Sequence, residues 1–281
     1  MNILWLGEQE SKNSSLVGSK AATLSSLFGN YNVPIGFIIP KNYFLESTLN
    51  HGNVTEHKQV SEAYKKLSSL VDTKTLGVAI RSSSLDEDGS LNSFAGQHDT
   101  FLNIKGESNV LKTIVQCSIS ASTLRASEYR KRLDIKSDNS QIPVIVQQMI
   151  PSEVSGVAFS SNPITKKDNE IFISTSWGLG ESIVDGIVTP DNYIVDKDDK
   201  SIKMSQVNHK DIMIIPSEHG TVESEVSSDM QDQSSVSEDQ IIEISDLLIK
   251  LENQMKQAVD VEFGYHHGRL YLLQCRPITT L

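Results

Sequence analysis

The residues best suited to chemistry lie near the C-terminus, where the residue pattern predicts a β-hairpin. Strands over 259–264 and 270–276 flank a turn at His266-His267-Gly268. If that turn centres near Gly268, four polar side chains share one face, because strand residues two apart point the same way. They form two facing pairs, Glu262 with Gln274 and Asp260 with Arg276. The alternate residues then face the core, namely Val261, Phe263, Leu273 and Cys275.

The two facing pairs predict a site for a cation and a phosphate. A carboxylate beside an amide oxygen offers the hard oxygen ligands that Mg²⁺ prefers, and an arginine can hold a phosphate through two hydrogen bonds. The hairpin alone fits an ordinary half-buried hairpin with polar outer residues better than it fits a metal site. A register slip of one residue would also separate the pairs. We expect His266 and His267 to be solvent-exposed turn residues, with metal binding as the lesser alternative.

Two loops and one lysine could bind phosphate groups. The strand Val78-Ala79-Ile80 runs into Arg81-Ser82-Ser83-Ser84, and a second small-residue loop spans Gly96, Gln97, His98, Asp99 and Thr100. Loops of this composition can surround a phosphate with backbone N–H groups, although plain surface turns have the same composition. A polar loop over 11–18 leads to Lys20, which precedes a helix. Lysines there are more often simply solvated.

The elements that would position these groups alternate between strands and helices along the chain. A buried strand over 143–146 ends at Gln147, Gln148, Met149 and Ile150. Their alternation of polar and apolar residues fits a hinge that pairs with an adenine edge, and it fits a plain loop equally well. Helices are expected over 108–133 and from Ser237 onward, the latter opened by a Ser237–Gln240 capping box. Its apolar stripe runs Ile241, Ile244, Leu248, Leu251, Met255 and Ala258. The polar stretch 217–239 is expected to be exposed or mobile.

Composition sets limits on the class of protein. The 281 residues carry a formal net charge of −11, which opposes binding to nucleic acid or to an anionic membrane surface. Two cysteines without metal-site spacing are expected to be reduced thiols. No stretch is long and apolar enough to span a membrane. We therefore expect a cytoplasmic protein.

Taken together, the motifs resemble a known family over nearly the whole chain. They are 18–24 (GSKAATL), 33–37 (VPIGF), 79–84 (AIRSSS), 93–100 (SFAGQHDT), 147–149 (QQM), 155–159 (SGVAF), 177–181 (WGLGE), 189–191 (TPD), 260–263 (DVEF) and 273–279 (LQCRPIT). The sequence is similar to the ATP-binding domain of phosphoenolpyruvate synthase, pyruvate phosphate dikinase and rifampin phosphotransferase. The resemblance implies an α+β, two-lobed ATP-grasp-like fold with nucleotide between the lobes. The first lobe would span 1–146 and the second 147–281.

The resemblance also implies roles for individual residues. Lys20 and Arg81 would bind phosphates, together with Ser83, under a covering loop of residues 96–100. Residues 147–150 would form the adenine hinge. Glu262 and Gln274 would hold Mg²⁺, and Arg276 would grip the phosphates. Lys20, Arg81 and Arg276 are therefore the expected catalytic residues.

The function implied by the resemblance is transfer of the β-phosphoryl group of ATP with release of AMP. Relatives continue into a phosphohistidine domain, whereas this chain ends soon after Arg276, so the expected acceptor is a histidine on a separate protein. The alternatives are direct phosphorylation of a small molecule, such as an antibiotic, and an idle nucleotide-binding subunit. Two departures from the family pattern are Ser19, in place of a frequent glycine, and Phe263, in place of a frequent tryptophan.

Overall fold

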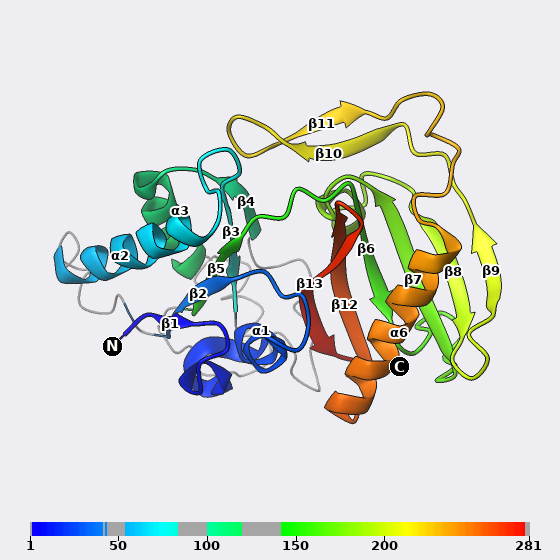
Figure 1. The fold of residues 1–281 in the computed structure, drawn as a ribbon, viewed down its shortest axis with the longest axis horizontal. Coiled ribbons are helices and arrows are strands. Elements are labelled where there is room, and N and C mark those ends of the chain that lie inside the picture. The colour runs from blue at the N-terminus through cyan, green and yellow to red at the C-terminus, as the bar shows by residue number, and fades with distance from the viewer. Residues whose placement is uncertain (1, 42, 44–53, 84–99, 120–141, 279–281) are drawn as a thin grey trace, which may run out of the picture. The chain divides into compact units, whose positions relative to one another are not determined.

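In the computed structural model the described residues are 2–41, 43, 54–83, 100–119 and 142–278 (Figure 1). They form two compact units. Unit 1 comprises Met1–Asn30, Pro34–Met149 and Glu218–Gly220, and unit 2 comprises Tyr31–Val33, Ile150–Ser217 and Thr221–Leu281. The main division therefore follows Met149, whereas the sequence suggested a lobe boundary after residue 146. The mixed α+β class is confirmed.

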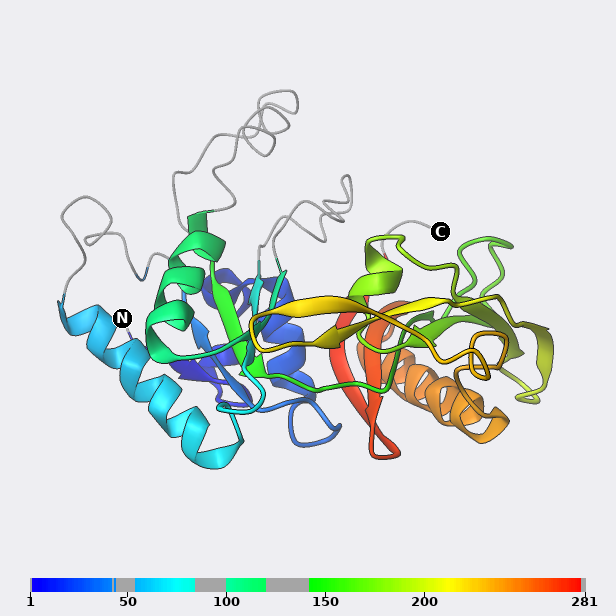
Figure 2. The same cartoon turned by 90° about the horizontal axis from the view of Figure 1, so that it is seen from above.

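Unit 1 is built on a five-stranded antiparallel sheet in the order β1-β2-β5-β3-β4. The strands are β1 (Leu4–Trp5), β2 (Gly36–Ile39), β3 (Val78–Ser82), β4 (Thr100–Ile104) and β5 (Val144–Gln148). The helices are η1 (Glu10–Lys12), α1 (Ser14–Leu27), α2 (Val54–Leu70) and α3 (Glu107–Ile119). Figures 1 and 2 show α2 and α3 on one side of this sheet and α1 on the other.

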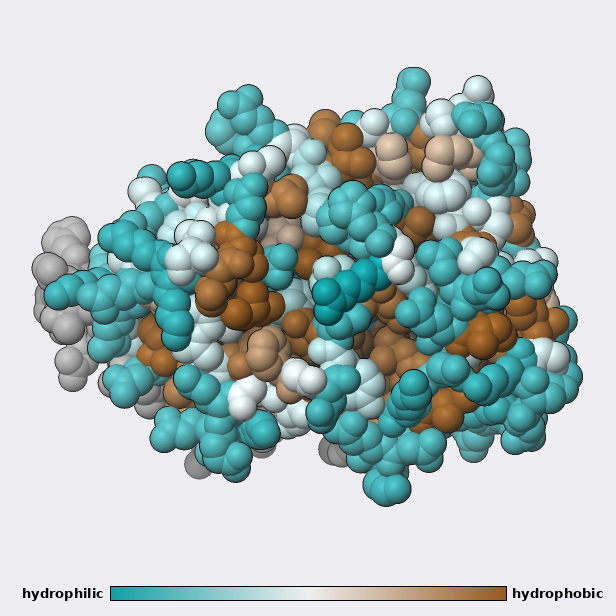
Figure 3. All heavy atoms as spheres, in the orientation of Figure 1, coloured by the Kyte–Doolittle hydropathy of each residue, from teal (hydrophilic) through white to brown (hydrophobic). Residues whose placement is uncertain are grey.

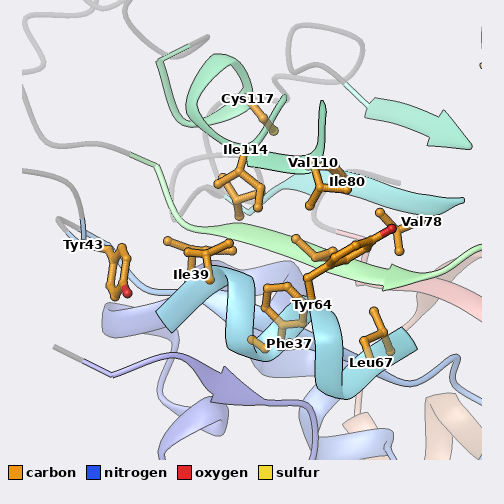
Figure 4. Packing of buried hydrophobic residues seen from close by; sticks show 14 residues of the cluster. Phe37, Ile39, Tyr43, Tyr64, Leu67, Val78, Ile80, Val110, Ile114 and Cys117 are labelled. Carbon is orange, nitrogen blue, oxygen red and sulfur yellow. The ribbon is translucent and has the colours of Figure 1, made fainter. Parts of the chain in front are cut away.

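The core of unit 1 follows from the two-residue period of its strands. Phe37, Ile39, Val78 and Ile80 point to the face covered by α2 and α3, as Figure 4 shows. The alternate buried residues point to the opposite face, namely Ile38, Ala79 and Ile145. The sequence predicted a polar loop over residues 11–18, and this is wrong, because α1 begins at Ser14, where the Asn13 side chain accepts from the Ser15 N–H.

Unit 2 contains a six-stranded antiparallel sheet in the order β13-β12-β6-β7-β8-β9. The strands are β6 (Val154–Phe159), β7 (Glu170–Trp177), β8 (Asp191–Asp196), β9 (Ile202–Gln206), β12 (Val259–His266) and β13 (Arg269–Pro277). A separate hairpin pairs β10 (Ile212–Pro216) with β11 (Thr221–Glu225), and the short helix α5 is Glu181–Val184. Strand β11 of this hairpin lies within the stretch 217–239. That stretch is largely exposed as expected, although Val226, Ser235 and Val236 are buried.

Helix α6 (Glu238–Met255) packs against β12, β6 and β7. The Ser237–Gln240 capping box is confirmed, because each side chain bonds the other residue's backbone N–H. Ile241, Ile244, Leu248 and Leu251 form the buried stripe. The predicted stripe extended to Ala258, and this is wrong, because Lys256 adopts a left-handed conformation (φ 59°) and ends the helix.

The surface is mixed in hydropathy. On the face shown in Figure 3, apolar residues gather in separate patches between hydrophilic side chains. None of the helices in the described ranges is both long and apolar enough to cross a membrane.

Candidate functional site

The C-terminal hairpin of unit 2 contains the facing pairs that the sequence predicted. Its turn residues are His267 and Gly268, both with positive φ (50° and 71°), as a two-residue type I′ turn requires. The register joins Asp260 to Arg276 and Glu262 to Gln274. Tyr265 fixes the hairpin to α6 through a 2.7 Å hydrogen bond to the Glu243 carboxylate, and burial together with that carboxylate raises the pKa of the phenol.

A β-bulge produces this register. From the turn, the regular pairing runs to Phe263 opposite Leu272 and would continue with Glu262 opposite Leu273. Instead the register shifts between Glu262 and Phe263, so that Gln274 faces Glu262. The prediction that Leu273 faces the core is therefore wrong. Leu273 is half-buried, and Leu272 is buried instead. Val261, Phe263 and Cys275 are buried, as predicted.

The polar side chains of the two pairs are in direct contact. Gln274 Nε2 donates to Glu262 Oε1 at 2.9 Å. Arg276 donates to both carboxylate oxygens of Asp260, from Nε at 3.0 Å and Nη2 at 2.8 Å. The Arg276 and Asp260 side chains are 25% and 17% exposed, so the pair is partly shielded but still accessible. Asp260 was not among the expected site residues, although its place opposite Arg276 was evident from the pairing.

The donor set fits a magnesium ion. Glu262 offers carboxylate oxygens, and the neighbouring Gln274 side chain offers an amide oxygen once its amide turns its oxygen instead of its nitrogen toward the cation. Such O/N exchanges in an amide require only a side-chain rotation. Asp260 lies two residues before Glu262 on the same face of β12 and adds a further negative charge.

Unit 1 brings together Lys20, Ser83 and the strand that carries Arg81. Helix α1 is interrupted at Gly18 (φ 78°, ψ 164°), where an added Cβ would lie 1.7 Å from the Ser83 carbonyl oxygen. Just after this kink, the Ala21 N–H donates to Ser83 Oγ at 3.0 Å. Ser83 thus caps the second part of α1, and Lys20 lies in the first turn of that part.

Arg81 and Ser83 owe their positions to the central strands of unit 1. Arg81 lies in β3 and pairs with Ile145 and with Thr100, the exposed first residue of β4. The ladder between β3 and β5 continues one step beyond β3, because the Ser83 N–H donates to the Pro143 carbonyl at 2.9 Å. Residues two apart on an extended chain share a face, so Arg81 and Ser83 point to the same side. Gly96, Gln97, His98 and Asp99 lie outside the described residues.

The expected adenine hinge ends strand β5. Gln147 is buried, and its Nε2 donates to the Pro34 carbonyl at 3.1 Å. The Gln148 N–H donates to the Ile35 carbonyl. Met149 and Ile150 follow, both buried. The Gln147 side chain therefore supports the chain entering β2.

Glu153 was not expected beside the two histidines of the turn, for which metal binding was the lesser alternative. Glu153, His266 and His267 converge at the turn of the C-terminal hairpin. Only His267 is as exposed as expected, at 81%, whereas His266 is 26% exposed. The adjacent histidines were visible in the sequence, but their approach to Glu153 depends on the pairing of β6 with β12.

Comparison with known proteins gives consistent results. The family model described as "Pyruvate phosphate dikinase, AMP/ATP-binding domain" matches residues 53–281. The protein named "Probable phosphoenolpyruvate synthase" from Methanocaldococcus jannaschii is 32% identical over 99% of this chain and 27% of its own length. The "Uncharacterized phosphotransferase YvkC" of Bacillus subtilis is 37% identical over 98% of this chain and 35% of its own length.

A third relative covers a smaller share of the chain, and one solved structure is only distantly similar. The phosphoenolpyruvate synthase of Pyrococcus furiosus is 38% identical over 80% of this chain and 28% of its own length. A dinucleotide-forming acetyl-coenzyme A synthetase from Ca. Korarchaeum cryptofilum aligns with 92% of this chain and 91% of its own, at 11% identity and a TM-score of 0.41. That likeness is too weak to support an argument about the site. The chain spans about a third of the length of the curated relatives named here. On the family match and these identities, the chain belongs to the family of pyruvate phosphate dikinase AMP/ATP-binding domains.

Proposed function

We propose that this chain binds ATP with Mg²⁺ and transfers the β-phosphoryl group to a histidine outside residues 1–281. The other products are AMP and inorganic phosphate, the latter formed from the γ-phosphoryl group and water. The observation that carries the proposal is the register of the C-terminal hairpin, which joins Glu262 to Gln274 and Asp260 to Arg276. Membership in an AMP/ATP-binding domain family supports the nucleotide. The names of the relatives, phosphoenolpyruvate synthase and phosphotransferase, support phosphoryl transfer.

In the proposed mechanism the chain contributes positioning and positive charge and does little covalent chemistry. Glu262 and Gln274 would hold Mg²⁺, which supplies neutralisation of phosphate charge when bound. Arg276 would bind phosphate oxygens, with its guanidinium oriented by the two hydrogen bonds to Asp260.

The proposed role of unit 1 is to bind the other phosphates and the base. Lys20 would contribute its ammonium group from the first turn after the Gly18 kink, and Arg81 its guanidinium from β3. Ser83 would act indirectly, because its hydroxyl holds the backbone at Ala21 and thereby fixes the neighbouring Lys20. Residues 96–100 would cover the phosphates. Residues 147–149 of unit 1 and Ile150 of unit 2 would contact adenine.

The histidines of the chain are poor candidates for the acceptor. In relatives, the accepting histidine follows a Gly- and Thr/Ser-rich loop, and none of the seven histidines here has that context: His51, His57, His98, His209, His219, His266 and His267. An active site that excludes water should hydrolyse ATP slowly in the absence of an acceptor.

The test uses ATP radiolabelled at the β position and the phosphohistidine domain of a relative as acceptor. We expect AMP release to accelerate when the acceptor is added, and an acid-labile label to appear on the acceptor band of a gel. Label on this chain, label on a small molecule without a second protein, or ADP as the product would each refute the proposal.

A further inference from the structure

The turn end of the C-terminal hairpin carries three ligand-type side chains that the proposed function does not use. Glu153, His266 and His267 each offer one ligand atom, and these atoms all lie within 4.8 Å of one another. All three residues belong to unit 2. The cluster lies about 13 Å along β12 from Glu262, since strand residues rise about 3.3 Å each.

The backbone holds this cluster in place. The Glu153 N–H donates to the Tyr265 carbonyl at 2.9 Å, which fixes the start of β6 beside the end of β12. The His267 N–H lies 3.3 Å from both carboxylate oxygens of Glu153. Neighbouring strand residues normally point to opposite faces, but the left-handed conformation of His267 brings its ring beside that of His266. The ring centroids are 4.0 Å apart.

The distances from Glu153 to the two histidine nitrogens suit a small tetrahedral cation. Glu153 Oε1 lies 3.6 Å from His266 Nδ1 and 3.3 Å from His267 Nδ1. Ligands about 2.0–2.1 Å from a tetrahedral Zn²⁺ are about 3.3 Å apart, so both separations match an edge of that polyhedron within a few tenths of an ångström.

One buried nitrogen of the cluster supports a ligand. His266 Nδ1 is a buried atom for which the described part of the chain shows no hydrogen-bond partner, and such atoms are costly unless something satisfies them. The His267 and Glu153 side chains are 81% and 54% exposed, which leaves a path for an ion and room for a water as fourth ligand.

We propose that His266 Nδ1, His267 Nδ1 and a Glu153 carboxylate oxygen bind a divalent transition-metal ion of the zinc type. Two imidazoles and one carboxylate match the ligand preferences of Zn²⁺, Co²⁺ and Ni²⁺, whereas Mg²⁺ prefers oxygen ligands alone. The site is therefore chemically distinct from the Glu262–Gln274 pair. The two rings are inclined by only 33°, so the exposed His267 ring must turn before both nitrogens can point at one ion.

The test is a titration of the metal-free, magnesium-free chain with Zn²⁺ alone, followed by competition with a chromophoric chelator. We expect one Zn²⁺ per chain. Loss of a residue that only supports a ligand lowers metal affinity about 10- to 100-fold. His266→Ala and His267→Ala each remove a ligand itself, so each should lower the affinity for Zn²⁺ at least about tenfold. Glu153→Gln keeps an acceptor for the His267 N–H but loses the charge, and should weaken binding as well.

Two matched measurements separate this site from adventitious histidine binding. His209→Ala removes an exposed histidine paired with Asp232 and should leave Zn²⁺ binding unchanged. Co²⁺ in place of Zn²⁺ should give the intense visible absorption of tetrahedral coordination in the wild type and lose it in His267→Ala, whose exposed position spares the fold. Absence of stoichiometric binding in the wild type, or equal binding by the His266→Ala/His267→Ala double variant, would overturn the proposal. Neither outcome bears on ATP turnover.

Discussion

Among the ion pairs of unit 2, Asp191–Lys210 and Asp260–Arg276 have similar chemistry and opposite surroundings. Lys210 and Asp191 are both completely buried, with Lys210 Nζ 2.7 Å from Asp191 Oδ1. Arg276 and Asp260 are 25% and 17% exposed. The buried pair has its polar groups satisfied within the protein: Asp191 also accepts from the backbone of Asn208 and from the N–H and hydroxyl of Ser235.

The difference separates a structural ion pair from the pair that is proposed to bind phosphate. The Asp191–Lys210 pair anchors the segment after β9 and the residues before α6 onto β8, and solvent does not reach it. Exchanging one of its partners for a ligand would leave a buried charge, at a large cost in free energy. The Asp260–Arg276 pair is accessible, as the proposed contact between a phosphate and the Arg276 guanidinium requires. Burial, more than residue type, distinguishes the two roles.

The largest expected effect is on stability, from Lys210→Met. This substitution leaves the Asp191 carboxylate buried without its cation, which typically lowers the free energy of unfolding by about 3–5 kcal/mol. Urea unfolding of the wild type and the variant measures this loss. Lys203→Met is the matched control, because Lys203 is 49% exposed where it contacts Asp196 and Asp199, and little change is expected. Equal unfolding midpoints for the two variants would show that the buried pair is not structural.

The next effect is on turnover, from Glu262→Ala and Gln274→Ala. Removing either candidate ligand of Mg²⁺ should raise the activation free energy of metal-dependent ATP turnover by about 3 kcal/mol. This slows turnover roughly a hundredfold. The free energy of unfolding should change much less than in Lys210→Met. Steady-state rates and calorimetry with and without Mg²⁺ measure the two effects, with the exposed Gln257→Ala as control. Unchanged affinity and turnover in both variants would disprove the metal assignment.

A smaller effect is expected on phosphate affinity. Arg276→Ala and Arg81→Ala should each weaken ATP binding by about 2 kcal/mol, roughly thirtyfold, because a charge-assisted contact is lost. Adenosine lacks phosphates and should bind as tightly as before. Competition assays with both ligands separate the contributions. Parallel losses for adenosine and ATP would mean that the substitution had damaged the fold.

The smallest effect is expected from Asp260→Asn, which can be compared directly with the same change at Asp191. Asp260→Asn keeps a hydrogen-bond acceptor for Arg276 and should cost less than about 1 kcal/mol in stability, as expected for an accessible pair. It should weaken ATP binding by a few fold, since the guanidinium is held less firmly. The same change in Asp191, which is buried beside Lys210, should destabilise the chain several times more. Equal losses of stability for the two variants would contradict the contrast between the two pairs.

The sequence predicted the pairs of the C-terminal hairpin but not the reason for them. The pairing of Glu262 with Gln274 was predicted from a turn centred on Gly268, whereas the turn is His267-Gly268 and the bulge at Leu273 restores the register. A bulge depends on the packing of both strands and on neighbouring β6, so the alternation of residue types alone does not reveal it. The predicted roles of these residues in binding stay predictions.

Long-range contacts account for most of what was missed. Lys210 follows a polar stretch and resembles an ordinary exposed lysine, because nothing near it in sequence indicates Asp191 as a partner. The approach of Glu153 to His266 and His267 joins residues more than a hundred positions apart. Local signals predicted better: the Ser237–Gln240 box opened α6 as expected, since capping involves only neighbouring residues.

The kink at Gly18 has a consequence for the order in which unit 1 folds. The first turns of α1 need only local contacts, whereas the Ala21 N–H is held by Ser83, 62 residues further along, and Ser83 in turn bonds Pro143. Contacts across such separations cost more loop-closure entropy than contacts within one helical turn, so they form later. Lys20 should therefore reach its final position late, when β3 joins β5. Pulsed hydrogen exchange during refolding should show protection of the Ala21 amide together with the amides of β3, after those of the preceding helical turn.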